Sequence, residues 1–213
     1  MRNTCPSNEE IENVSNALRQ LAGSPERCAL LVIDVQKEFC DPQWRGNDET
    51  ISIAGQIATL APAFREAGAT LYAIYISSVP ERNFHRFIPD EESDIIVPKD
   101  DESAFRGSNI QTLLKKNGHT HILACGFNLS ACVKETAKDA CKKKYDTTLL
   151  KDLTGNGRVD ISRDVNTELS YYRKTGCRLA SASDILAGEH VFHEKNVRQS
   201  GWRAMLNSLP LRF

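Results

Sequence analysis

Three side chains of this sequence, a carboxylate, an amine and a thiol, have the types and positions that covalent acyl transfer needs. Asp34 ends a strongly apolar run, Lys99 follows a second apolar stretch, and Cys132 stands at the start of a predicted helix. A carboxylate can take the proton of a thiol, a nearby ammonium favours the anions that form, and a thiolate can attack a carbonyl carbon. We therefore treat Asp34, Lys99 and Cys132 as candidate catalytic residues.

Each of the three residues also has an ordinary explanation when it is considered alone. An aspartate at a strand end often caps a neighbouring loop, although burying it unpaired costs several kcal/mol. Lys99 stands in a polar segment, where a lysine is usually a surface residue, so it matters only if the fold brings it to Asp34. An isolated cysteine is most often a small buried apolar residue. The chemistry therefore depends on the fold.

The position of Cys132 relative to the predicted helix argues for a reactive thiol. Ser130 is the expected N-cap, which places Cys132 in the first helical turn. The positive end of a helix dipole lowers the pKa of a thiol there. The sequence thus predicts a cysteine that ionises more readily than a free one.

Apolar runs of strand length alternate with helical patterns along the chain, and these elements must position the three side chains. The expected strands are residues 28–35, 71–76, 121–126, 147–150 and 178–181. One helix is expected directly after Ser7, and four more are expected at residues 53–68, 110–117, 130–144 and 165–174. This alternation predicts an α/β protein, a three-layer α/β/α Rossmann-like fold with a mostly parallel central sheet. In such sheets ligands bind beyond the carboxyl ends of the strands.

Length and composition fit a single domain over residues 1–213, with 40% hydrophobic and 26% charged residues and no repeat or linker. No apolar run reaches the roughly 18 residues that a bilayer span needs. The N-terminus has a capping-box spacing, Ser7 to Glu10, in place of the apolar stretch of a secretory signal. We therefore expect a cytoplasmic protein.

Charge and cysteine content exclude several classes of function. The net charge of −1, from 27 basic and 28 acidic residues, gives no field that would hold nucleic acid or an anionic membrane. Seven cysteines are an odd number, and none form a C-x-x-C pair. A disulfide framework and a structural zinc site are therefore disfavoured.

Three motifs occur in order along the chain. They are Leu30-Leu-Val-Ile-Asp34-Val-Gln-Lys-Glu-Phe39, Lys99-x-x-x-Ser103-Ala-Phe105, and Gly126-x5-Cys132-Val133 with Thr136-Ala137 and Asp139-Ala140. Together they resemble the isochorismatase-like cysteine hydrolases. The resemblance covers residues 28–188 approximately, so the N-terminal helix and the tail 189–213 lie outside it.

The resemblance implies a sheet in which the first strand neighbours the strand ending at Gly126, so that Asp34 faces Cys132. It further implies that the backbone N–H groups of Asn128 and Cys132 bind the oxyanion, next to a cis peptide bond between Phe127 and Asn128. Family members include nicotinamidases, carbamoyl and ureido hydrolases and isochorismatases. The presence of the cysteine favours acyl transfer at a C–N bond of a small molecule, through a thioester.

The sequence departs from the family pattern at two places. Nicotinamidases carry an Asp-x-His metal site after the second strand, where this chain has Ser77-Ser-Val-Pro80, so we expect no metal and no cofactor. The segment 127–130, Phe-Asn-Leu-Ser, replaces the usual small residues before the cysteine, which leaves the oxyanion site and the pocket shape open.

Aromatic residues near the expected site are the candidates for the substrate pocket: Phe39, Trp44 and Phe127. His85 lies in a loop that can line or cover the pocket, whereas His119 and His121 are expected at the surface or at a strand edge. Packing beneath a loop is the alternative role of the aromatic residues.

Two other functions remain open, an enol-ether hydrolase acting on isochorismate or a similar compound, and an inactive family member that serves as a binding module.

The family assembles as dimers or larger oligomers, so we expect a homo-oligomer, with apolar tail residues available for a subunit contact: Trp202, Met205 and Leu209.

Overall fold

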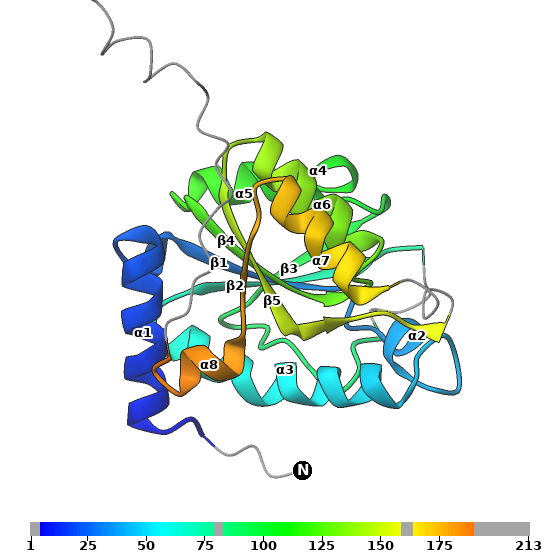
Figure 1. The fold of residues 1–213 in the computed structure, drawn as a ribbon, viewed down its shortest axis with the longest axis horizontal. Helices are drawn as coiled ribbons and strands as arrows, with labels where there is room; N and C mark the ends of the chain where they lie inside the picture. The colour runs from blue at the N-terminus through cyan, green and yellow to red at the C-terminus, as the bar shows by residue number, and fades with distance from the viewer. Residues whose placement is uncertain (1–4, 79–82, 159–163, 190–213) are drawn as a thin grey trace, which may run out of the picture.

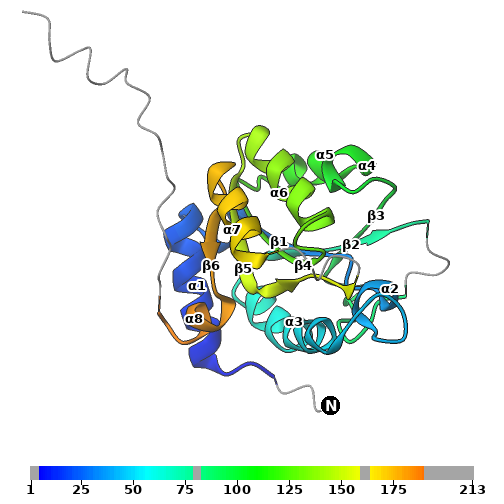
Figure 2. The same ribbon diagram turned by 45° about the vertical axis from the view of Figure 1, so that its right-hand side comes forward.

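The computed structural model describes residues 5–78, 83–158 and 164–189, and its centre is a six-stranded sheet (Figures 1 and 2). The strands are β1 (Cys28–Ile33), β2 (Thr70–Ile76), β3 (Ile95–Lys99), β4 (His121–Phe127), β5 (Asp146–Gly155) and β6 (Arg178–Ala180). Their order is β3-β2-β1-β4-β5-β6, and every neighbouring pair is parallel. The predicted α/β fold with a parallel sheet is confirmed.

Helices cover both faces of the sheet (Figure 2). They are α1 (Asn8–Ala22), α2 (Lys37–Cys40), α3 (Asp48–Glu66), α4 (Ala104–Gly107), α5 (Ile110–Lys116), α6 (Cys132–Lys142), α7 (Val165–Lys174) and α8 (Ala182–Leu186), with a 3-10 turn at Pro25–Arg27. Helices α1, α3 and α8 pack on one face, and α4 to α7 pack on the other (Figure 1).

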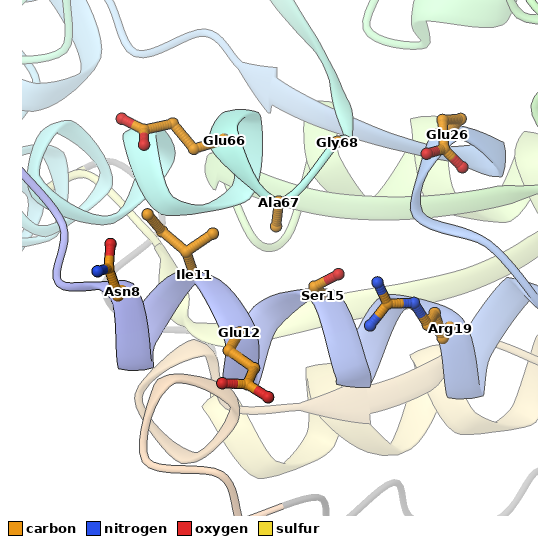
Figure 3. Close-up of a pocket in the computed structure, with 9 residues that line it drawn as sticks. All are labelled: Asn8, Ile11, Glu12, Ser15, Arg19, Glu26, Glu66, Ala67 and Gly68. Atoms are coloured by element: carbon orange, nitrogen blue, oxygen red, sulfur yellow. The ribbon is translucent and has the colours of Figure 1, made fainter.

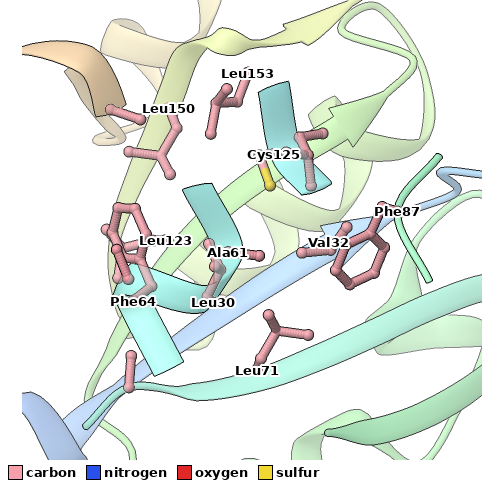
Figure 4. Packing of buried hydrophobic residues seen from close by; sticks show 14 of the residues in the cluster. Leu30, Val32, Ala61, Phe64, Leu71, Phe87, Leu123, Cys125, Leu150 and Leu153 are labelled. Carbon is pink, nitrogen blue, oxygen red and sulfur yellow. The ribbon is translucent and has the colours of Figure 1, made fainter. Parts of the chain in front are cut away.

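Two apolar clusters, one on each face, join the helices to the sheet. Along β1 the side chains alternate, since Leu30 and Val32 belong to one cluster and Leu31 and Ile33 to the other. Figure 4 shows part of the first cluster, in which strand residues meet Phe64 of α3. Because both faces of β1 are buried, its register is fixed, and with it the place of the residue that follows the strand.

The strand order reverses direction at β1. The chain proceeds from β1 to β2 and β3 on one side, and then crosses over to β4, β5 and β6 on the other. The carboxyl ends of β1 and β4 therefore form the topological switch point, where open parallel sheets leave a crevice. The predicted adjacency of the first strand and the strand ending at Gly126 is confirmed, with Ile33 opposite Gly126.

The structure agrees with several local predictions from the sequence. Ser7 and Glu10 form the predicted capping box of α1. Helix α6 spans Cys132–Lys142, close to the predicted range 130–144, and most of the cysteines are buried. Among the described residues, no helix is long and apolar enough to cross a membrane.

Two predictions about secondary structure and burial were wrong. Residues 95–99 form β3, so Lys99 ends a strand and does not lie in a surface loop; Pro98 is tolerated there because β3 is an edge strand. His119 and His121 are buried, with 5% and 0% of their surface exposed, because β4 is a central strand and Tyr72 packs against the His119 ring. Sequence reasoning placed both at the surface because histidine is usually polar and half-exposed.

Candidate active site

Asp34 follows β1 directly and its side chain is fully buried. Its backbone has a positive φ of 52°, and its N–H donates to the carbonyl of Ile74 at 2.8 Å. Gly126 on the neighbouring strand has no room for a side chain, because a Cβ there would meet the carbonyl oxygen of Ile33. This close approach of β1 and β4 brings the residues after the two strands together.

Gln36 fastens the segment after Asp34 to β2. Its Oε1 accepts from the N–H of Ile76 at 2.8 Å, and its Nε2 donates to the Ile76 carbonyl at 3.4 Å. Gln36 is fully buried, so its amide serves the backbone of the adjacent strand. Sequence reasoning included Gln36 in a motif but assigned it no role.

Lys99 joins the two other candidate residues. Its Nζ lies 2.9 Å from Oδ2 of Asp34 and 3.4 Å from Sγ of Cys132, and it donates to the carbonyl of Asp101 at 3.0 Å. The Lys99 side chain is fully buried. Three side chains that are far apart in the sequence thus converge at the switch point, within bonding distance of the same ammonium.

Cys132 is the first residue of α6, which agrees with the predicted position in the first turn. The N-cap is Ala131, however, and its side chain makes no capping hydrogen bond. The Ser130 side chain was predicted as the cap but donates to Oδ1 of Asn156 at 3.0 Å. The Ser130 hydroxyl therefore bonds to the segment after β5 and does not cap α6.

The electrostatics of the cluster correct the prediction of an easily ionised thiol. Burial first, and then the Asp34 carboxylate, raise the pKa of Cys132 to about 12, although Lys99 acts in the opposite direction. Burial also raises the pKa of Asp34, opposed by Lys99 and by the Cys132 thiol as a hydrogen-bond donor. Desolvation and the neighbouring carboxylate favour the neutral thiol, so the resting cysteine needs a base.

The turn between β4 and α6 carries the predicted oxyanion groups. The peptide bond between Phe127 and Asn128 is cis, as the resemblance implied. Within the part of the chain that the structure describes, the backbone N–H groups of Asn128 and Cys132 have no hydrogen-bond acceptor. Two unpaired backbone donors beside a thiol are the arrangement that can stabilise a developing oxyanion.

The unusual segment 127–130 is held by the end of β5 and the residues after it. Leu129 N–H donates to the carbonyl of Gly155 at 2.9 Å, and Gly157 N–H donates to Oδ1 of Asn128 at 3.0 Å. Sequence reasoning interpreted Gly155-Asn-Gly157 only as a turn, because nothing local shows which distant segment a turn contacts.

The second motif is bound to the helix that carries Cys132. Ser103 donates to Oδ2 of Asp139 at 2.7 Å, and the N–H of Ala104 donates to Thr136 at 3.1 Å. Arg106 also donates to Oδ2 of Asp139, at 2.7 Å. These hydrogen bonds thus hold the segment after Lys99 against α6.

The predicted pocket residues occupy three different environments. Phe127 is fully buried in the core on the α3 face. Phe39 packs partly buried against the same core, and Trp44 is 55% exposed. His85 is partly buried and its N–H donates to the carbonyl of Val35, which puts its loop beside the strand end that carries Asp34. Pocket lining by Phe39, Trp44, Phe127 and His85 stays a prediction.

A hollow of about 490 Å³ lies elsewhere, between α1 and the end of α3 (Figure 3). Glu26 and Gly68, which line it, precede β1 and β2, so it opens at the amino-terminal edge of the sheet, away from Asp34. In residues 5–78, 83–158 and 164–189, no group of three His, Cys, Asp or Glu side chains is arranged to hold a metal ion. His190, His193 and the apolar tail residues lie outside the described residues.

Comparison of the sequence with family models matches residues 28–181 to the Isochorismatase domain, which is well over half of the chain. An uncharacterized isochorismatase family protein, YrdC of Bacillus subtilis, is 29% identical over 139 residues, 61% of this chain and 74% of its own length. The secreted isochorismatase effector Isc1 of Verticillium dahliae is 22% identical over 80% of this chain and 99% of its own length.

Solved structures share the fold. A cysteine hydrolase from Pseudomonas syringae superposes with a TM-score of 0.65 at 20% identity, covering 78% of this chain and 93% of its own. N-carbamoylsarcosine amidase from Thermoplasma acidophilum superposes with a TM-score of 0.63 at 20% identity, covering 73% of this chain and 96% of its own. At these identities the likeness concerns the architecture of the sheet and its helices.

Proposed function

The chain belongs to the isochorismatase family, and from that premise we propose that it is a metal-independent cysteine hydrolase that cleaves a C–N bond of a small amide, carbamoyl or ureido compound. The observation that carries the proposal is the position of one buried ammonium, that of Lys99, 2.9 Å from the Asp34 carboxylate and 3.4 Å from the Cys132 sulfur. A carboxylate, an ammonium and a thiol in mutual contact are the groups that a covalent acyl transfer requires.

The first half of the reaction forms a thioester. Asp34 accepts the thiol proton while Sγ of Cys132 bonds to the substrate carbonyl carbon, and the carbonyl oxygen becomes an oxyanion. The backbone N–H groups of Asn128 and Cys132 are free to donate to that oxygen, and Lys99 offsets the negative charge beside it. The C–N bond then breaks, and the proton on Asp34 passes to the leaving nitrogen.

The second half restores the cysteine. Water attacks the thioester carbonyl and gives a proton to Asp34, the C–S bond breaks, and the sulfur recovers the proton as the acid product leaves. Because the resting thiol has a raised pKa, the base has to act in the step of attack itself. Asp34, whose carboxylate receives no hydrogen bond from a backbone N–H of the described residues, is suited to accept and return that proton.

The proposed scheme uses no metal, and Ser77, which follows β2, bonds to the backbone of Lys99. The N–H and hydroxyl of Ser77 both donate to the carbonyl of Lys99, at 2.8 and 3.1 Å. Ser77 thereby orients the residue that contacts Asp34, in the region where nicotinamidases of the family carry metal ligands.

The experiment is a screen of small amides, carbamoyl amines and ureido compounds for ammonia release. We expect turnover by the native protein, none by Cys132→Ala, and native turnover by the control Cys141→Ala, which removes a thiol from the same helix. Intact-mass measurement should detect an acyl adduct that Cys132→Ala lacks. Ammonia release by Cys132→Ala at the native rate would rule out the covalent route.

The same assay separates the other two functions. Pyruvate release from isochorismate without ammonia would identify an enol-ether hydrolase, and tight binding of a small molecule without any product would identify a binding module. A single domain over residues 1–213, a cytoplasmic location and assembly as a homo-oligomer stay predictions beside this proposal.

A further inference from the structure

The turn that carries the oxyanion groups is fastened at its midpoint by one side chain. Oδ1 of Asn156 accepts two hydrogen bonds from Ser130, one from its backbone N–H at 3.0 Å and one from its hydroxyl at 3.0 Å. Ser130 lies two residues after Asn128 and two before Cys132, so it stands between the two unpaired N–H groups. Fixing Ser130 therefore fixes the separation and direction of both donors.

Asn156 is itself held rigidly. Its side chain is buried in a residue only 8% exposed, and its carbonyl accepts from the Asn47 side chain at 3.1 Å. The next residue, Gly157, donates its N–H to Oδ1 of Asn128. The Asn156-Gly157 pair thus contacts the turn at two points, and Asn47 at the start of α3 supports it from behind.

We infer that Asn156 is a positioning residue of the oxyanion site, which acts by holding Ser130 so that the N–H groups of Asn128 and Cys132 converge on the carbonyl oxygen of the substrate. The inference rests on the proposed function. It also explains how a turn that lacks the small residues usual in the family keeps two free donors, because a side chain from beyond β5 supplies the constraint.

The carboxamide oxygen, and not the nitrogen, carries this role. Nδ2 of Asn156 is buried and has no hydrogen-bond partner in the part of the chain that the structure describes. A substitution that keeps an oxygen acceptor, Asn156→Asp, therefore preserves both bonds to Ser130, whereas Asn156→Ala removes them and leaves a buried N–H without an acceptor. This pair of variants separates positioning from the mere presence of a side chain.

Two reagents test the inference without knowledge of the natural substrate. p-Nitrophenyl acetate acylates a thiol through an oxyanion: sulfur bonds to the carbonyl carbon, the C–O bond breaks to release p-nitrophenolate, and the thiol proton passes by way of Asp34 to water. Iodoacetamide alkylates the same sulfur with loss of iodide and forms no oxyanion. The rate of modification at Cys132 is measured for each reagent by peptide mass spectrometry.

We expect Asn156→Ala to lower the rate of acylation at Cys132 about 10- to 100-fold, less than the roughly 100- to 1000-fold that follows the loss of an oxyanion donor, because both donors are kept and only their placement changes. Alkylation should stay within about twofold of the native rate, because the thiol and its base are unchanged. Asn156→Asp should acylate at a rate closer to that of the native protein than to that of Asn156→Ala. Asn13→Ala, which removes a side-chain bond to the Leu186 carbonyl far from the turn, is the matched control and should leave both rates unchanged.

The outcomes separate the inference from the function on which it rests. If the native protein is not acylated at Cys132, the proposed function fails and the inference with it. If the native protein is acylated and Asn156→Ala is acylated equally fast, or if both reactions slow by the same factor, only the inference fails. Acylation of Asn156→Asp as slow as that of Asn156→Ala would also overturn it, since the oxygen acceptor would then be irrelevant.

Discussion

Two buried carboxylates of this protein, Asp34 and Asp94, are each paired with a cation, but their surroundings differ. Asp94 accepts from Nε and Nη2 of Arg65 at 2.8 and 2.7 Å, and from the backbone N–H of Asp90 at 2.9 Å. Asp34 contacts the Lys99 ammonium and the Cys132 thiol, and no backbone N–H of the described chain donates to its carboxylate. One carboxylate is saturated with donors, and the other is not.

The difference shows which of the two ion pairs is structural. The bidentate guanidinium and the backbone donor bond to both oxygens of Asp94 and fix the carboxylate in place. A carboxylate that meets only one ammonium and one thiol keeps a raised pKa and an accessible lone pair, which a general base needs. We therefore assign proton transfer to Asp34 and fold stability to Asp94.

The largest expected effect comes from Asp34→Asn. The amide cannot accept the thiol proton, so we expect kcat/KM for the best amide substrate to fall by at least about 1000-fold, within the range of general-base effects. Asp94→Asn, the matched change at the saturated carboxylate, should leave kcat/KM within about twofold. Equal losses in the two variants would break the distinction between the two ion pairs.

Asp94→Asn should have its effect on stability. The change removes the charge that Arg65 needs, and because the Arg65 side chain is 25% exposed the cost should lie between about 1 kcal/mol for an exposed pair and about 3 kcal/mol for a buried one. Urea unfolding followed by circular dichroism measures the free energy of unfolding. A loss below about 1 kcal/mol, the size of an exposed ion pair, would contradict the assignment.

The pH dependence of turnover sharpens the comparison further. Because burial raises the pKa of Asp34 above its usual value, protonation of this base should cut kcat/KM tenfold per pH unit on the acid side, at a pH above that of an ordinary aspartate. The thiol, with a pKa of about 12, stays protonated above that limb, so kcat/KM should be flat to about pH 9.5. A rate that climbs steadily and levels off near pH 8.5, the pKa of a free cysteine, would indicate attack by a thiolate without Asp34.

The fold could be predicted from the sequence where the pattern is local and repeated. The strand predicted at residues 28–35 is observed at Cys28–Ile33, and the helix predicted to follow Ser7 begins at Asn8, because both have strong local signals. Strand β3 was missed because it is five residues long, includes Pro98, and gains its strand character from pairing with β2.

The three candidate catalytic residues were predicted from their types, their positions and the resemblance, but their electrostatics were not. Burial of Cys132 against Asp34 reverses the expected shift of the thiol pKa, and burial depends on the whole fold. Asn156 was missed for a related reason, since its partner Ser130 is 26 residues away and no local pattern indicates such a contact.

The smallest expected effect concerns a third carboxylate, Asp139, which lies between the two extremes. It accepts from the Ser103 hydroxyl and from Arg106, both at 2.7 Å, so Ser103→Ala removes one donor and leaves the other. We expect the free energy of unfolding to fall by about 1 kcal/mol, the net value of one hydrogen bond, with kcat/KM reduced less than about threefold. A loss of activity as large as that of Asp34→Asn, with stability unchanged, would mean that the bond between the second motif and α6 takes part in the chemistry, and that saturation with donors does not separate structural carboxylates from reactive ones in this molecule.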